Sequence, residues 1–151
     1  GRSAYENFQA NTAGLDVEVF RGLSAEAARQ FDGEVDLLYI DGAHDRESVL
    51  ADLDGWRVRG ETFVHDAFSA KGVTLALLER RAFSRRWRYL GSVRSLAHFR
   101  REPVSLPSAA INSLRMTSRL TYFARNAAIK VLISRGRSAH WLGWAEPRQP
   151  Y

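Results

Sequence analysis

Two pairs of polar residues are the positions of this sequence best suited to chemistry. Asp41 and His44 follow a nearly continuous apolar run, Val35–Ile40, and His65 and Asp66 follow the next such run. A continuous apolar run is typical of a strand in a parallel sheet covered on both faces. Ligands bind at the carboxyl ends of such strands, because loops and helix N-termini gather there.

The spacing of these residues suits a metal site. If the two strands are neighbours, they lie about 4.8 Å apart, and Asp41 and Asp66 converge on one cation. Carboxylate oxygens favour Mg²⁺, Mn²⁺ or Ca²⁺ over Zn²⁺, and His44 is placed either to complete the ligand set or to act as a base. In the alternative interpretation, Asp41 and Asp66 cap the helices that follow them. The spacing alone leaves both interpretations open.

Helices and strands alternate along the part of the chain that must position these residues. The sequence predicts helix 5–14, strand 17–20, helix 25–31 capped by Ser24, strand 35–40, a helix from its cap Asp45 to Trp56, strand 62–64, helix 69–83, and strands 87–90 and 96–101. Alternation implies right-handed crossovers and a parallel sheet, and the final strand pair implies an antiparallel edge. We therefore expect an α/β fold whose sheet is mostly parallel.

Two prolines, Pro103 and Pro107, end this alternation, and a basic helix is predicted over Ala109–Ser134. This change divides the chain into a domain at 1–102 and a basic helical extension with a tail at 103–151. In the helix of the first domain that follows Asp45, Trp56 is predicted to anchor the core.

Charge is distributed unevenly along the chain. Residues 1–75 carry 14 acidic and 7 basic side chains, whereas residues 76–151 carry 3 acidic and 15 basic ones. The basic half either solvates its helices or meets phosphate, lipid headgroups or an acidic partner. The chain has no cysteine, which excludes disulfides, thiolate metal sites and a cysteine nucleophile, and a cytoplasmic location is expected.

Three runs taken together, Val35–His44, Val49–Trp56 and Gly60–Asp66, resemble the second half of class I S-adenosylmethionine-dependent methyltransferases. They are similar to the group whose fourth strand ends in I-D-G-x-H and whose fifth ends in H-D or E-D, which includes metal-dependent O-methyltransferases. The resemblance covers roughly residues 5–101. It implies a Rossmann-like sheet, S-adenosylmethionine as cofactor, and O-methyl transfer to a small molecule or a sugar hydroxyl.

The resemblance also implies roles for individual residues. His44 would be the general base that takes the proton of the acceptor hydroxyl. The metal, Mg²⁺ or Mn²⁺, would be held by Asp41, His65 and Asp66. The turn Gly22-Leu23-Ser24 would lie against the adenine of the cofactor, and the remaining cofactor contacts would come from Asp41 and Gly42.

The sequence departs from the family pattern in two places. Arg59-Gly60-Glu61 replaces the P-G-G that commonly precedes the fifth strand. The glycine-rich cofactor loop and the acidic residue that holds the ribose would lie before Gly1. We therefore expect a sheet without its first two strands, very weak affinity of this chain for S-adenosylmethionine, and an open strand edge at 37–39. Candidates to cover that edge are segment 17–20, a second copy of the chain, or an N-terminal piece on another polypeptide.

Other functions remain open at this point. The basic helix predicted over Ala109–Ser134 would suit a binding module for nucleic acid or an anionic membrane surface, although its charges do not fall on one clean face. Binding to phosphates would weaken steeply with salt, whereas cofactor binding would not. A non-catalytic remnant and a divalent-metal phosphohydrolase are the remaining alternatives. Loss of a metal-induced rise in melting temperature on Asp41→Asn would distinguish a metal site from helix capping.

Overall fold

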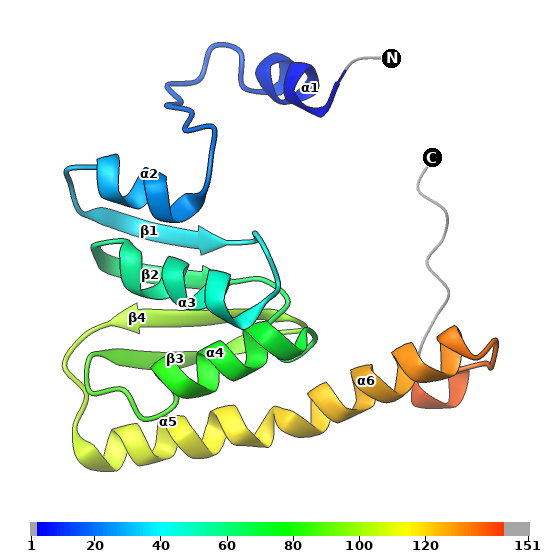
Figure 1. The fold of residues 1–151 in the computed structure, drawn as a ribbon. Coiled ribbons are helices and arrows are strands. Elements are labelled where there is room, and N and C mark those ends of the chain that lie inside the picture. The colour runs from blue at the N-terminus through cyan, green and yellow to red at the C-terminus, as the bar shows by residue number, and fades with distance from the viewer. Residues whose placement is uncertain (1–2, 144–151) are drawn as a thin grey trace.

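The computed structural model describes residues 3–143, in which helices pack against one mixed sheet (Figure 1). In chain order the elements are α1 Ala4–Asn11, α2 Ser24–Gln30, β1 Val35–Ile40, α3 Arg46–Gly55, β2 Val58–Val64, α4 Lys71–Arg81, β3 Trp87–Val93, β4 Leu96–Arg101, α5 Leu106–Ser118, α6 Leu120–Ser134 and a 3₁₀ turn at His140–Leu142. None of the helices among these residues is both long enough and apolar enough to cross a membrane.

The four strands lie in the order β1-β2-β4-β3. Strands β1 and β2 are parallel, whereas β4 is antiparallel to both β2 and β3. The α/β class and the antiparallel C-terminal pair are as predicted, but the expectation of a mostly parallel sheet is wrong. The hairpin β3–β4 inserts its second strand next to β2, so two of the three strand pairings are antiparallel.

Helices α3 and α4 cover one face of the sheet and form the core with it (Figure 1). Strand residues alternate between faces, so Ile40 and Val64 are buried against these helices. On the opposite face, Leu37 is 56% exposed and Tyr39 is 52% exposed. The covered face therefore supplies most of the hydrophobic stabilisation, and the second face is partly open to solvent.

The two edges of the sheet differ. Along β3, the Asn112 side chain donates to the Trp87 carbonyl, and Arg115 donates to the carbonyls of Tyr89 and Leu90. Helix α5 thus satisfies carbonyl groups of this edge. At the other edge, no strand among residues 3–143 pairs with the outer side of β1, as expected from the sequence.

The predicted strand at 17–20 is absent, and residues 15–21 form neither helix nor strand. Val17 and Val19 are each 44% exposed. Alternating valines favour a strand only where a partner supplies backbone hydrogen bonds and a packed face, and this segment has neither. Segment 17–20 therefore does not cover the open edge of β1.

The single basic helix predicted at 109–134 is two helices, α5 and α6, that meet at Arg119. Thr117 and Ser118 bond through their hydroxyls to the carbonyls of Ser113 and Arg115, and such local bonds compete with a continuous helix. The first helix also starts earlier than predicted, because Pro107 lies in its first turn, where proline is tolerated.

The basic side chains of these two helices contact the chain itself. Arg119 donates to the Arg94 carbonyl, Arg125 to Leu142 and Gly143, and Lys130 to Ser69. Together with Arg115, which donates to carbonyls of β3, these are the four basic residues of the region predicted as one helix. These side chains therefore use hydrogen-bond donors on carbonyls of the chain itself.

Gly60 allows β1 and β2 to stay paired across an irregularity. Val35 pairs with Val58 and Leu37 with Glu61, so β2 carries one additional residue. A Cβ atom at Gly60 would lie 2.2 Å from the carbonyl oxygen of Asp36, a contact that no side chain can occupy. The bulge at this glycine keeps the two strands in register up to their carboxyl ends.

Candidate functional site

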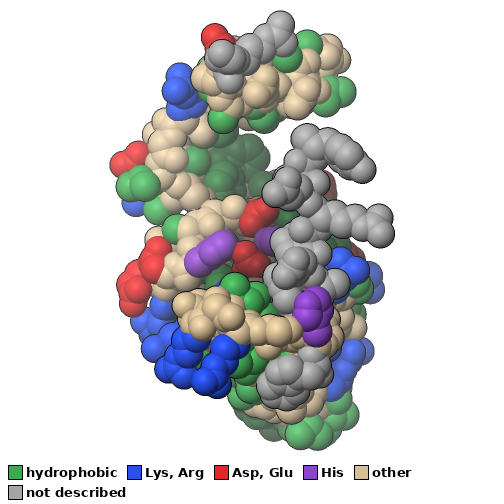
Figure 2. Space-filling view, turned by 90° about the vertical axis from the view of Figure 1, so that its right-hand side faces the viewer, with side chains coloured by type: hydrophobic (Ala, Val, Ile, Leu, Met, Phe, Trp, Pro, Cys, Tyr) green, Lys and Arg blue, Asp and Glu red, His purple; other side chains and the backbone are tan. Residues whose placement is uncertain are grey.

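The predicted site residues at the ends of β1 and β2 lie together in the fold. A backbone hydrogen bond of 2.9 Å from His65 N to the Ile40 carbonyl continues the parallel ladder beyond the last strand residues. Asp41 and His65 therefore leave the sheet side by side. Figure 2 faces this edge of the molecule and has acidic and histidine side chains near its centre.

Three of these side chains could hold a metal ion. Asp41, His65 and Asp66 each offer one ligand atom, and these atoms all lie within 4.8 Å of one another. His65 Nδ1 is 3.1 Å from Asp41 Oδ1 and 3.5 Å from Asp66 Oδ2. The structure thus brings together the three residues predicted as metal ligands.

The environment of His65 Nδ1 fits a metal ligand. The atom is buried and forms no hydrogen bond within the described part of the chain. Asp41 Oδ1 is within hydrogen-bonding distance of this nitrogen, but the angles of the contact do not fit a hydrogen bond. A buried polar atom without a partner is costly, and a cation between the imidazole and the carboxylates would remove that cost. One nitrogen and two carboxylates are a ligand set that Mn²⁺ and Mg²⁺ accept.

The capping alternative is wrong for both aspartates. The cap of α3 is Asp45, whose side chain accepts a hydrogen bond from Ser48 N, as predicted. The residue before α4 is Ala70, which offers no side-chain cap. Neither Asp41 nor Asp66 therefore caps the helix that follows it.

Asp66 is held in a strained turn. Its φ is +51°, in the left-handed region, and Phe68 two residues later has φ +57°. Such conformations cost about 1–3 kcal/mol each and persist where surrounding contacts impose them. Here Ser69 Oγ donates to Asp66 Oδ1 at 2.8 Å, Phe68 is fully buried, and Lys130 of α6 donates to the Ser69 carbonyl. The turn therefore fixes where the Asp66 carboxylate lies.

His44, the predicted general base, lies beside this cluster. Its Nε2 is 3.1 Å from Asp66 Oδ2, and its side chain is 51% exposed. The loop that carries it contacts the start of α4 closely, because Gly72 has no side chain: a Cβ there would lie 2.2 Å from the His44 carbonyl oxygen. His44 therefore has both a fixed backbone and access to solvent.

A hollow of about 320 Å³ lies beside Asp41 and borders helices α2 and α3. It is lined by three residues predicted to bind cofactor, Ser24, Asp41 and Gly42, together with Leu38, Tyr39, Ile40, Asp52 and Trp56. Gly22 and Leu23, predicted to share this role, line a separate hollow of about 60 Å³. The five residues predicted to bind the cofactor therefore lie in two neighbouring hollows and not in one.

Ser24 is the first residue of α2, and the helix is capped by Leu23 without a side-chain bond, so the predicted Ser24 cap is wrong. Its hydroxyl instead accepts a hydrogen bond from Trp56 Nε1 at 3.1 Å. Trp56 packs against the core as predicted, and this bond also ties α3 to the start of α2 at the rim of the hollow.

Asp52 is a residue of this hollow that the sequence analysis missed. Its side chain is buried at 9% exposure, and it forms no hydrogen bond or ion pair with any residue from 3 to 143. The Asp52 carboxylate oxygens are not among the fully buried unpartnered atoms of residues 3–143, and Asp52 lines the hollow, so it offers an acceptor to whatever fills the hollow. The signal available in the sequence was its position between Val49 and Trp56 on the apolar side of a helix.

Tyr39 adds a second polar group near Asp41. Its hydroxyl lies 3.5 Å from Asp41 Oδ2. Desolvation, followed by the charge of Asp41, raises the pKa of the Tyr39 phenol above its ordinary value of 10.0. The phenol therefore stays protonated at neutral pH and can act only as a neutral hydrogen-bonding group.

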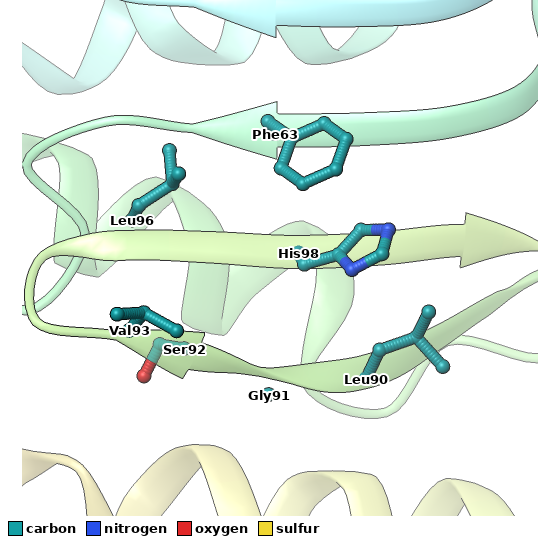
Figure 3. Close-up of a pocket in the computed structure, with 7 residues that line it drawn as sticks. All are labelled: Phe63, Leu90, Gly91, Ser92, Val93, Leu96 and His98. Carbon is teal, nitrogen blue, oxygen red and sulfur yellow. The ribbon is translucent and has the colours of Figure 1, made fainter.

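A second hollow of about 330 Å³ lies on the sheet face opposite α3 and α4 (Figure 3). Its lining residues are Phe63, Leu90, Gly91, Ser92, Val93, Leu96 and His98. The rings of Phe63 and His98 stack at a centroid distance of 4.2 Å. Phe63 is two residues before His65 on β2, so this hollow adjoins the Asp41–His65–Asp66 cluster.

Glu61 binds two basic side chains next to this hollow. His98 Nε2, whose ring lines the hollow, contacts Glu61 Oε2, and Arg100 Nε donates to Glu61 Oε1 at 2.9 Å. These bonds, that of His98 foremost, lower the pKa of Glu61 from its ordinary value of 4.5. Because the folded state holds this proton less tightly than the unfolded state, Glu61 stabilises the fold above about pH 4.5. That contribution is lost as the pH falls through the lowered pKa.

We therefore expect the melting temperature to fall between about pH 5 and pH 3, and to fall less in Glu61→Gln. Circular dichroism melts at several pH values measure the difference. Glu18→Gln, in the exposed segment before α2, is the control and should follow the unchanged protein. An equal fall in Glu61→Gln and the unchanged protein would contradict the assignment.

One comparison with known proteins covers the part of the chain that carries this site. Residues 2–66 match the family model described as a methyltransferase domain. The matched span ends at Asp66 and includes His44, the Asp41–His65–Asp66 cluster and every residue of the hollow beside Asp41. No curated protein matches the chain. The part of the chain that carries the candidate site is thus similar to a methyltransferase domain, which suggests methyl transfer in general.

Proposed function

We propose that the chain takes part in S-adenosylmethionine-dependent O-methyl transfer to a small molecule, assisted by Mg²⁺ or Mn²⁺. The observation that carries the proposal is the convergence of Asp41, His65 and Asp66, within 4.8 Å, at the carboxyl ends of two parallel strands. This cluster lies inside the span that matches a methyltransferase domain.

The chemistry asks little of the protein beyond alignment. Methyl transfer from a sulfonium is an in-line displacement, and holding two reactants in the right geometry contributes several kcal/mol. When bound, a divalent cation lowers the pKa of an acceptor hydroxyl that contacts it. Asp41, His65 and Asp66 would hold this cation, and no covalent intermediate with the protein is needed.

His44 is suited to take the proton of the acceptor. Its Nε2 faces the Asp66 carboxylate at 3.1 Å, a contact in which Nε2 donates and which orients the ring. Nδ1 is then the nitrogen that accepts a proton. The 51% exposure of the side chain gives this proton a route to water.

The two hollows beside the cluster suit the two reactants. The hollow at Ser24, Gly42 and Asp52 offers hydroxyl and carboxylate acceptors, which match the amino and hydroxyl donors of S-adenosylmethionine. The hollow at Phe63 and His98 is aromatic and mostly apolar, which suits the apolar part of an acceptor. The cluster lies between them along the sheet edge.

The proposal is tested by transfer of a labelled methyl group from S-adenosylmethionine, at millimolar concentration, to a panel of catechols and sugars with Mn²⁺ present. We expect labelled product, and about a tenfold higher KM for the cofactor in Asp52→Asn, because one hydrogen bond to a charged acceptor is lost. Asp54→Asn is the matched control: Asp54 is on the same helix but pairs with Arg80 at the surface.

Absence of methyl transfer to every acceptor, together with no binding of the cofactor by saturation-transfer NMR, would contradict the proposal. An equal KM in Asp52→Asn and Asp54→Asn would remove the hollow at Asp52 from the cofactor site.

A further inference from the structure

An arginine-lined hollow lies at the end of the sheet opposite the metal-ligand cluster. Its volume is about 350 Å³, and its lining residues are Arg59, Arg85, Arg86, Arg101, Glu102 and Pro103. Strand β2 begins beside it and β4 ends beside it, at the left of Figure 1. The length of β2, roughly 20 Å, separates this hollow from Asp66, so it is a different site.

Backbone hydrogen bonds fix the two segments that supply most of these arginines. The Arg86 carbonyl accepts from Glu102 N at 3.1 Å, and the Arg85 carbonyl accepts from Val104 N at 2.9 Å. Residues 85–86 and 102–104 therefore lie side by side as a continuation of the β3–β4 pair. The walls of the hollow are part of the sheet framework.

Two of the guanidinium groups are also anchored. Arg85 Nε donates to the Val104 carbonyl at 2.9 Å, and Arg101 donates through one terminal nitrogen to the Val58 carbonyl at 2.9 Å. A guanidinium has five N–H donors in a fixed plane, so each anchored group keeps donors for a ligand. Anchoring reduces the entropy that a ligand must remove when it binds.

The charge of the hollow is not balanced by the chain. Asp36 pairs with Arg59, and Glu102 pairs with Arg88 outside the hollow. For Arg85, Arg86 and Arg101, no carboxylate of residues 3–143 lies within 4.0 Å. Like charges that line one hollow repel one another, and a bound anion relieves that repulsion.

We propose that this hollow binds the phosphate group of a small molecule. Phosphate presents several acceptor oxygens and up to two negative charges, which match planar guanidinium donors from two segments. The hollow lies within the size range of small-molecule sites, and Pro103 and the arginine stems provide contact area for the rest of a ligand. The site does not depend on the function proposed for the opposite end of the sheet.

Calorimetric titration of the full chain with inorganic phosphate and with phenyl phosphate, at constant ionic strength, tests this site. We expect Arg86→Gln to weaken binding of phosphate by about tenfold, the effect of losing one charge-assisted hydrogen bond. Arg86 forms no side-chain hydrogen bond or ion pair within residues 3–143, so the substitution removes no polar interaction of the fold. Arg29→Gln on α2 makes the same charge change away from the hollow and is the control.

Tighter binding of phenyl phosphate than of inorganic phosphate identifies a phosphate ester as the ligand, and equal affinities identify free phosphate; both outcomes support the site. Unchanged binding in Arg86→Gln, or equal weakening in Arg29→Gln, would overturn it. Tighter binding of a single-stranded oligonucleotide, with a steep dependence on salt, would instead assign the surface to nucleic acid and overturn the small-molecule proposal.

Discussion

Replacing Asp41 with asparagine is expected to abolish the stabilisation of the chain by Mn²⁺. A ligand that binds only the folded state stabilises it by about 2.7 kcal/mol at a concentration about 100 times its Kd. For a chain of this size, that corresponds to roughly 5–10 °C in melting temperature. Asparagine keeps one oxygen but removes the charge from one of three converging ligands, so Asp41→Asn should show little of this rise.

The fold itself should survive this substitution, because among residues 3–143 the Asp41 side chain contacts polar groups only at Tyr39 and His65, both near the protein surface. Differential scanning fluorimetry with Mn²⁺, followed by EDTA, measures the effect and its reversal. Asp36→Asn is the matched control, since Asp36 lies near the start of β1, the strand that Asp41 follows, and pairs with Arg59 there. An equal Mn²⁺ shift in Asp41→Asn and the unchanged protein would show that the cluster does not hold the ion.

The second large effect is expected from Gly72→Ala. The added Cβ would lie 2.2 Å from the His44 carbonyl oxygen and 2.7 Å from Arg46 N, both backbone atoms. Neither can rotate away, so α4 and the loop that carries His44 must separate. Overpacking of this kind costs about 3 kcal/mol, or roughly 6–12 °C in melting temperature.

Gly55→Ala in α3 is the control for this substitution. Its Cβ would meet Ala28 Cβ at 3.5 Å, an ordinary contact, and alanine favours the helix by about 0.5–1 kcal/mol over glycine. Thermal unfolding distinguishes the two variants, and NMR of the His44 ring reports whether its surroundings change. A stable Gly72→Ala variant with an unchanged His44 signal would contradict the close approach described here.

Strand β1 lies at the end of the strand order β1-β2-β4-β3, so its outer edge is uncovered. With β2 paired on one side, Leu37 and Tyr39 remain about half exposed, and the described residues supply no strand for the other side. Cover by a second copy of the chain or by a piece of another polypeptide remains a prediction, and analytical ultracentrifugation distinguishes a self-associating chain from a monomer.

The sequence by itself determined the elements near the site. The apolar run at β1, the Asp45 cap of α3 and the aspartates and histidines after each strand are local signals, because hydrophobic pattern and helix caps depend on nearby residues. The convergence of Asp41, His65 and Asp66 followed from one further assumption, that β1 and β2 are neighbours, which is correct.

Tertiary structure alone decided the rest. The valines at 17 and 19 form no strand because no partner meets them, and the basic region after Pro107 is two helices whose cations bond to distant carbonyls. Asp52 is a candidate site residue only because the fold places it in one hollow with Ser24 and Gly42. Arg85 and Arg101 line one hollow only because β3 pairs with β4. Contacts between residues far apart in the chain depend on packing and strand pairing, which local patterns do not specify.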